Sequence, residues 1–216
     1  MIEVYAREVD GTWFGLAHSE KRIIATTMGS DRGRTLKTLA RIIPSSAEHE
    51  VVEKASEFAE DAVLRLEKAH RSVEDFGAFS LATEHVPEPL VSVLKAAAAI
   101  PLGYVASYGG IAKAAGTDAQ TVGRIMASNP LYPIVACHRV VGADFSLVGY
   151  GGRKSPNALK AKLARLSVEC RGSKSPREVS TEGLKLTVYP TERVIQKAKR
   201  QGPSLSAMPQ RKLTSY

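Results

Sequence analysis

The chain has 216 residues, 44% of them hydrophobic, and a formal net charge of +8. This length fits one large domain or two small ones with a packed core. No run approaches the ~18 uninterrupted apolar residues of a membrane span, and residues 1–8 form no apolar signal segment. Two cysteines do not suggest a disulfide framework. We therefore expect an intracellular protein without membrane contact, cytoplasmic or, in a eukaryote, nuclear.

The first predicted elements are three strands. Asp10-Gly11 is a strong hairpin signal between two β-rich runs, and a third run follows a polar break. The three runs are residues 2–9, 12–18 and 22–27. This pattern predicts an antiparallel meander.

A helix is predicted after the strands. Ser45-Ser-Ala-Glu48 has the form of a capping box, and apolar residues then repeat at helical spacing over 51–66. We expect residues 1–75 to form an N-terminal α/β scaffold domain and residues 76–86 to be a connector.

A mostly helical part follows. Two short helices over 108–115 and 118–128, separated by a turn at Gly116, form a helix-turn-helix pattern. A helix over 87–100 precedes them, and another begins at Ser155-Pro156, where serine caps and proline enters the first turn. The predicted fold class is α/β: a small N-terminal antiparallel sheet plus helix, then a mostly helical C-terminal domain with a helix-turn-helix.

The positive charge gathers at the C-terminal end. Residues 170–216 hold ten Lys/Arg against three Glu, a net +7, and the rest holds 20 Lys/Arg against 19 Asp/Glu, a net +1. We expect a basic, partly disordered extension, with a short strand over 184–189, a basic helix over 191–200 and disorder from about 201. Such a composition is typical of non-specific attraction to phosphate, and equally of a solvated tail.

One segment offers candidate chemistry. Cys137 ends an apolar run and directly precedes His138 and Arg139. The thiolate is the reactive form of cysteine, and an adjacent base or positive charge favours it. His138 could be that base, and Arg139 could raise the local potential. Successive side chains of an extended segment point apart, so a water would bridge thiol and imidazole. The alternative is a cysteine packed as a small hydrophobe.

Several further motifs surround this segment. They are Pro101 to Ala112, Val122 to Met126, Asn129-Pro130, Cys137-His-Arg-Val-Val-Gly142 and Gly149-Tyr-Gly-Gly152. Together, over about residues 87–169, they resemble the O6-alkylguanine-DNA alkyltransferase family in order and near spacing.

The resemblance implies a DNA repair activity. Residues 87–169 would be the DNA-binding and active-site domain, and Cys137 would take the alkyl group from O6-alkylguanine in double-stranded DNA. O4-alkylthymine stays open as a second substrate. The thioether product is not hydrolysed, so each molecule would act once. The implied protein is a monomer without a cofactor, and nothing in the sequence supports the metal that some members hold.

The resemblance also assigns catalytic roles. Glu169, in the family's Lys…Leu-x-x-Glu pattern, would orient His138, although an exposed helix-end carboxylate is the plain alternative. The hydroxyl of Tyr108 would face the purine N3, and the backbone N–H of Gly151 would face O6, where charge develops.

Other residues would shape the pocket. Met126 and Tyr150 would wall it, unless they are ordinary core residues. The carbonyls of Cys137 and Val140 would accept from the exocyclic amine of guanine, and Asn129 would be a structural hinge.

The second helix of the helix-turn-helix would enter the minor groove, with Tyr108 also at the DNA. Docking there favours small residues, and the target base must be flipped out of the stack. The small residues are Ala119, Gly123 and Ala127. Gln120 stands where the family has an arginine that fills the vacated space, and Arg124, one turn on, would contact a phosphate.

A second departure from the family is Ala136, which replaces the usual proline and should loosen the loop before Cys137. Two other functions stay open. A non-catalytic lesion-binding relative would lack the cysteine, and a transcription regulator would leave Cys137, Tyr108 and the glycines of 149–152 unexplained.

Overall fold

The computed structural model describes residues 1–83, 86 and 88–200. Within them the chain forms a mixed α/β structure with two sheets and seven α-helices, in agreement with the α/β class. It divides into two compact units: unit 1 takes in 1–86 and 130–134, and unit 2 takes in 87–129 and 135–200. The disorder predicted from about 201 lies outside the described residues. None of the described helices is long and apolar enough to cross a membrane.

Unit 1 is built on a five-stranded sheet in the order β4-β1-β2-β3-β5. The strands are β1 (Ile2–Val9), β2 (Thr12–Ser19), β3 (Arg22–Gly29), β4 (His49–Val51) and β5 (Ser80–Leu81). The predicted meander corresponds to β1, β2 and β3, which pair antiparallel. The sheet as a whole is mixed, because β4 and β5 pair parallel to β1 and β3. These two edge strands are too short to show a sequence pattern.

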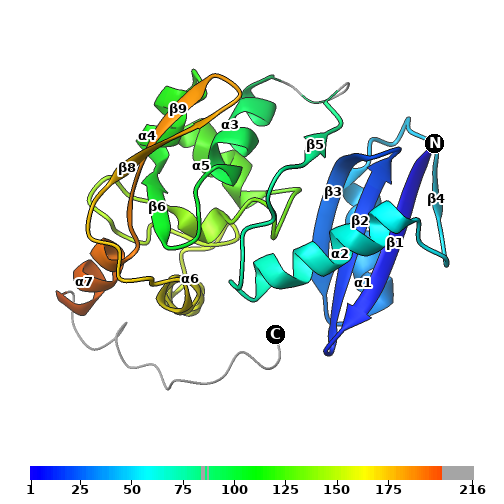
Figure 1. The fold of residues 1–216 in the computed structure, drawn as a ribbon, viewed down its shortest axis with the longest axis horizontal. Coiled ribbons are helices and arrows are strands. Elements are labelled where there is room, and N and C mark those ends of the chain that lie inside the picture. Colours follow the sequence, from blue (N-terminus) through cyan, green and yellow to red (C-terminus); the bar gives the residue numbers. More distant parts are fainter. Residues whose placement is uncertain (84–85, 87, 201–216) are drawn as a thin grey trace. The chain divides into compact units, whose positions relative to one another are not determined.

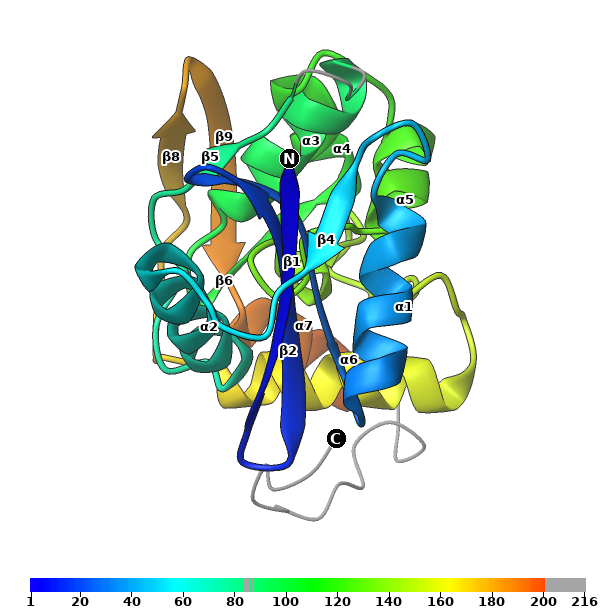
Figure 2. The ribbon, with the colours of Figure 1, turned by 90° about the vertical axis from the view of Figure 1, so that its right-hand side faces the viewer.

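Two helices, α1 (Arg32–Ile42) and α2 (Glu57–His70), cover opposite faces of this sheet (Figures 1 and 2). Helix α1 was not predicted. It packs closely, since a Cβ on Gly15 of β2 would lie 2.6 Å from Thr35. Helix α2 starts after Ser56, whose hydroxyl accepts from Ala59 N, so the helix start predicted at the capping box is wrong. The reason is that residues 49–51 pair with β1 as a strand.

Unit 2 combines five helices with a four-stranded sheet in the order β7-β6-β9-β8 (Figure 1). The helices are α3 (Glu88–Ala98), α4 (Tyr108–Ala114), α5 (Ala119–Ala127), α6 (Pro156–Val168) and α7 (Glu192–Arg200). The strands are β6 (Tyr104–Ser107), β7 (Val140–Val141), β8 (Arg177–Thr181) and β9 (Leu184–Pro190). All five helices match predicted segments, whereas the sheet went unrecognised except for β9.

The segment after α6 is folded into unit 2, and this corrects the expected separate extension for residues 170–200. Strand β9 pairs antiparallel with both β6 and β8. From α7, Val194 and Ala198 lie in one buried cluster with Leu163 and Leu166 of α6. Removing everything after residue 169 would therefore expose the core of unit 2, so the role of the basic residues has to be tested with point variants.

Candidate active site

Each helix of the helix-turn-helix starts at a residue whose side chain forms an N-cap. The Ser107 hydroxyl accepts from Gly110 N at 2.9 Å and starts α4. The Asp118 carboxylate accepts from the backbone N–H groups of Gln120 and Thr121 and starts α5. Gly116 makes the turn with a φ of +68°, a conformation that favours glycine. Local sequence therefore fixes where both helices start and how they are joined.

Helix α5 has one buried and one exposed face. Val122 and Met126 are buried, so Met126 packs in the core of unit 2. The predicted DNA-contacting residues lie on the accessible side, namely Ala119, Gln120, Arg124 and Ala127, which are exposed, and Gly123, which is half-buried. A Cβ on Gly123 would meet nothing within 4 Å. Internal packing thus does not require a glycine there, which favours close approach by a partner instead.

The nucleophile candidate lies on a tight turn. Cys137, His138 and Arg139 form a single 3₁₀ turn, which replaces the extended segment that we expected. Cys137 is 9% exposed, and its carbonyl accepts from Val140 N. Ala136 precedes the turn with a φ of −76°, inside the range of proline. The loop thus keeps a backbone that suits proline although the residue is alanine.

Glu169 is fully buried at the C-terminal end of α6, which excludes the exposed helix-end carboxylate. Its Oε1 lies 2.8 Å from His138 Nε2. Arg139 donates to the same carboxylate twice, from Nε at 2.8 Å and from Nη2 at 3.0 Å. A third donor of Arg139, Nη1, bonds to the carbonyl of Ile100 at 2.8 Å. One buried carboxylate therefore fixes both the imidazole and the guanidinium.

These contacts define the charge state of the imidazole. Burial lowers the pKa of His138 to about 4, although the neighbouring Glu169 raises it. For Glu169 itself, burial is outweighed by His138 and Arg139, which hold its pKa well below the usual range. A neutral imidazole facing a carboxylate carries its proton on Nε2, an assignment that follows from the hydrogen bond. Nδ1 has no hydrogen-bond partner among the described residues, so its lone pair can accept a proton.

The electrostatics of the thiol differ from the expectation. Burial raises the pKa of Cys137, and the charge of Lys162 and a hydrogen bond from Asn129 are the next contributions, both lowering it. Arg139 was expected to supply the positive potential, but its charge is paired with Glu169. Among the charged groups, Lys162 lowers the pKa of the thiol most and Arg165 lowers it less. Neither residue has a role in the sequence-based prediction.

Lys162 ties together the backbone around the site. Its ammonium donates to the carbonyls of Val140 at 2.5 Å, Leu147 at 2.9 Å and Gly149 at 2.9 Å. Burial lowers the pKa of Lys162 to about 8, against the opposing effect of Cys137. The signal was a lysine at helical spacing between the leucines of α6, because a charge on an apolar face is rarely buried without a purpose.

Three further pocket candidates, Tyr108, Tyr150 and Asn129, interact with Cys137 or His138. Burial raises the pKa of Tyr108 to about 12, with Cys137 adding to the shift, so the phenol keeps its proton and stays a donor. The ring of Tyr150 stands edge-on to His138, with centroids 6.5 Å apart. Gly151 is exposed with a φ of +55°. Asn129 Nδ2 donates to the Val135 carbonyl at 2.7 Å, before the catalytic turn.

Both carbonyls expected to bind the exocyclic amine already accept one hydrogen bond, that of Cys137 from Val140 N and that of Val140 from Lys162. Each carbonyl has a second lone pair, so their role stays a prediction. In the part of the chain that the structure describes, no three His, Cys, Asp or Glu side chains gather in a way that could hold a metal ion.

The chain is similar in sequence to known proteins. Residues 90–170 match the family model for 6-O-methylguanine DNA methyltransferase, DNA binding domain. A methylated-DNA–protein-cysteine methyltransferase of Pyrobaculum aerophilum is 55% identical over 53 residues, 24% of this chain and 36% of that protein. One from Mycobacterium leprae is 43% identical over 79 residues, 36% of this chain and 45% of that protein. The matched segment thus spans less than half of these curated relatives.

Solved structures align with this chain over a longer segment than the sequence matches do. The O6-methylguanine-DNA methyltransferase of Pyrococcus kodakaraensis KOD1 aligns with a TM-score of 0.55 at 26% identity, covering 78% of this chain and 99% of that one. The Mycobacterium tuberculosis OGT in complex with DNA gives a TM-score of 0.55 at 26% identity, covering 77% and 92%. These matches confirm the resemblance found in the sequence.

Proposed function

We propose that this chain, whose residues 90–170 belong to the O6-methylguanine DNA methyltransferase family, transfers the alkyl group of O6-alkylguanine in double-stranded DNA to its own Cys137. The observation that supports this most directly is the buried His138–Glu169 pair, whose histidine follows Cys137 on the same 3₁₀ turn. It lies in the same unit as a helix-turn-helix whose outer face is lined with small residues. In this proposal unit 2 binds DNA and performs the reaction as a monomer, and unit 1 is a scaffold.

The proton is removed first. Nδ1 of His138 takes the proton of the Cys137 thiol, through a bridging water, while Glu169 holds Nε2 and stabilises the imidazolium that forms. Lys162 then offsets the charge of the buried thiolate. This explains how a thiol whose pKa is raised at rest becomes a nucleophile when the base takes its proton.

The transfer is a displacement at the alkyl carbon. A bond forms between Sγ of Cys137 and that carbon, the carbon–O6 bond breaks, and its electron pair stays on the guanine. The phenol of Tyr108 and the backbone N–H of Gly151 donate to the resulting anion. Because the thioether has no leaving group that water displaces, the reaction stops after one turnover.

The proposal is tested by intact mass. The chain is incubated with duplex DNA that contains one O6-methylguanine, and peptide mapping follows. We expect the mass of one added methyl group, located on Cys137, and no turnover beyond one equivalent. A protein that binds the lesion but never gains mass would instead be a non-catalytic lesion binder.

The pKa of His138 predicts an unusual pH dependence. Since burial lowers this pKa from 6.5 to about 4, the imidazole stays a base in mild acid. The rate of transfer from free O6-alkylguanine should therefore fall to half near pH 4, or at a higher pH if the protein unfolds there. Between about pH 6.5 and pH 4, His138 is protonated in the unfolded chain but stays neutral in the folded one. The stability of the fold therefore falls as the pH falls through this window. A half-rate point near 6.5 in folded protein would contradict the assignment.

Gln120 predicts a weakness in base flipping. It is exposed in the first turn of α5, with its backbone N–H held by Asp118. A neutral glutamine replaces an extruded base less well than an arginine, which stacks and carries charge. We expect Gln120→Arg to speed repair of duplex DNA and to leave the reaction with free modified base unchanged. Equal acceleration of both, or of neither, would exclude Gln120 and point to Arg124 instead.

A further inference from the structure

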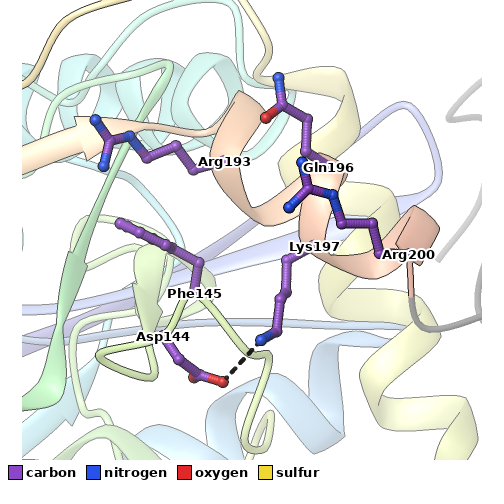
Figure 3. Close-up of a pocket in the computed structure, with 6 residues that line it drawn as sticks. All are labelled: Asp144, Phe145, Arg193, Gln196, Lys197 and Arg200. Atoms are coloured by element: carbon purple, nitrogen blue, oxygen red, sulfur yellow. Dashed lines mark ion pairs between the residues drawn. The ribbon is translucent and has the colours of Figure 1, made fainter.

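A second feature of unit 2 lies apart from the proposed active site. Helix α7 and the loop after β7 line an open hollow of about 510 Å³ (Figure 3). Its lining residues are Asp144, Phe145, Arg193, Gln196, Lys197 and Arg200. Helices α7 and α5 are well separated in both ribbon views (Figures 1 and 2), so the hollow is not part of the helix-turn-helix surface. It also involves α7, which lies beyond the 90–170 segment that matches the family.

The hollow has an excess of positive charge. Arg193, Lys197 and Arg200 recur at helical spacing on one face of α7, opposite the buried Val194 and Ala198. Lys197 Nζ is paired with Asp144 Oδ2 at 3.2 Å. Among the described residues, no carboxylate lies within ion-pair distance of Arg193 or Arg200. Two guanidinium groups therefore line the hollow without a neutralising partner in that part of the chain.

The exposed side chain of Arg193 lies against two aromatic rings. Its guanidinium carbon lies 5.3 Å from the ring centroid of Phe145 and 5.3 Å from that of Tyr189. The two rings stand edge to face at 5.4 Å. Contact with the rings already restricts the guanidinium, so it loses less conformational freedom when it binds a ligand. Its planar set of N–H donors also matches the oxygens of a phosphate.

The helix dipole does not account for this arrangement. Cations in the last turn of a helix are favourable, and that suffices for Lys197, Lys199 and Arg200. Arg193, however, lies in the first turn, where the dipole disfavours a positive charge. The contacts with Phe145 and Tyr189 offset that cost, and they leave the charge of Arg193 available to an anion in the hollow.

We propose that this hollow binds the phosphodiester backbone of DNA, as a contact additional to the one at α5. The inference rests on the proposed function insofar as DNA is the partner. Arg193 and Arg200 each bind phosphate oxygens, and the Gln196 amide donates between them. The chain thus holds DNA at two separated places, of which only the α5 surface lies in the family-matched segment.

The test compares salt dependences of binding. The probe is a long, unmodified duplex of mixed sequence, titrated at several salt concentrations. Loss of two phosphate contacts should reduce the slope of log K against log salt by about 1.8 in Arg193→Gln/Arg200→Gln. The matched control, Lys174→Gln/Lys199→Gln, also removes two exposed charges but neither lines the hollow. We expect the control to change the slope by less than half as much.

Two outcomes would overturn the proposal: an equal reduction in both double variants, or no reduction in the arginine variant. Arg200→Gln alone guards against misfolding, since this exposed side chain has no bond to lose among the described residues, and it should reduce the slope by about 0.9. Transfer from free O6-alkylguanine to the unaltered chain, measured without DNA, tests the proposed function separately. A chain that reacts with the free base yet shows equal slopes in both variants would retain its function and lose the second site.

Discussion

Replacing Cys137 by alanine should abolish alkyl transfer and leave DNA affinity nearly unchanged. The bond to the alkyl group forms at Sγ, so no residue can substitute for the thiol, whereas the groups expected to bind DNA lie on α5 and in the α7 hollow. Cys137 is 9% exposed, so its removal alters little of the surface that a duplex would meet. Mass spectrometry should show no adduct, and a binding titration should give a dissociation constant within about twofold of the original.

The second cysteine supplies the control. Cys170 is half-buried just after Glu169, and burial raises the pKa of its thiol as well. The side chains that act on its thiol are Glu192, Arg171, Glu169 and Lys199, none of which is an imidazole base. The Cys170→Ala protein should therefore accept one alkyl group at the original rate. An adduct on the Cys137→Ala protein, wherever it maps, would refute the assigned nucleophile.

Elements with strong local signals were predictable from the sequence. Asp10-Gly11 marked the hairpin, Gly116 marked the turn of the helix-turn-helix, and Ser155-Pro156 marked the start of α6. Each signal is a backbone preference of the residues themselves. The short strands β6 and β7 have no such signal, because they are defined by partners far along the chain.

Where two local patterns competed, tertiary pairing decided. Residues 45–48 have the form of a capping box and helical spacing follows from residue 51, yet residues 49–51 pair beside β1 as a strand. The basic C-terminal segment read as an extension because it is rich in Ser, Lys, Pro and Gln. The few apolar side chains, such as Val188 and Val194, are nevertheless fully buried, and they are what fold residues 170–200 into unit 2.

The candidate site, like the fold, was predictable from the sequence only in part. The family pattern led to Cys137, His138 and Glu169, and the structure brings the last two within 2.8 Å. The partners of Arg139 and Lys162 were not foreseeable. The position of Lys162 among the leucines of α6 indicates a buried side chain, but only the folded arrangement shows the three carbonyls that its ammonium contacts.

Glu169→Gln should combine a large loss of stability with slow transfer. The carboxylate accepts from His138 and twice from Arg139 within a fully buried cluster. Glutamine keeps the shape but removes the charge and turns an NH2 group toward one of these donors. Breaking a buried ion pair in this way costs about 3–5 kcal/mol. Denaturant unfolding should show this loss, and Glu178→Gln, which changes an exposed carboxylate, should show almost none.

The slower transfer has a separate cause. Without the carboxylate, the proton of His138 is no longer held on Nε2, and the tautomer with Nδ1 protonated cannot accept from Cys137. The sign of the pH effect follows from the pKa of Glu169, which is held below its usual range. Its stabilisation is complete above the unfolded pKa and is lost as the pH falls toward the folded one. The variant should therefore lose less stability in acid than the original chain. A folded Glu169→Gln protein with the original transfer rate would show that Glu169 does not orient the base.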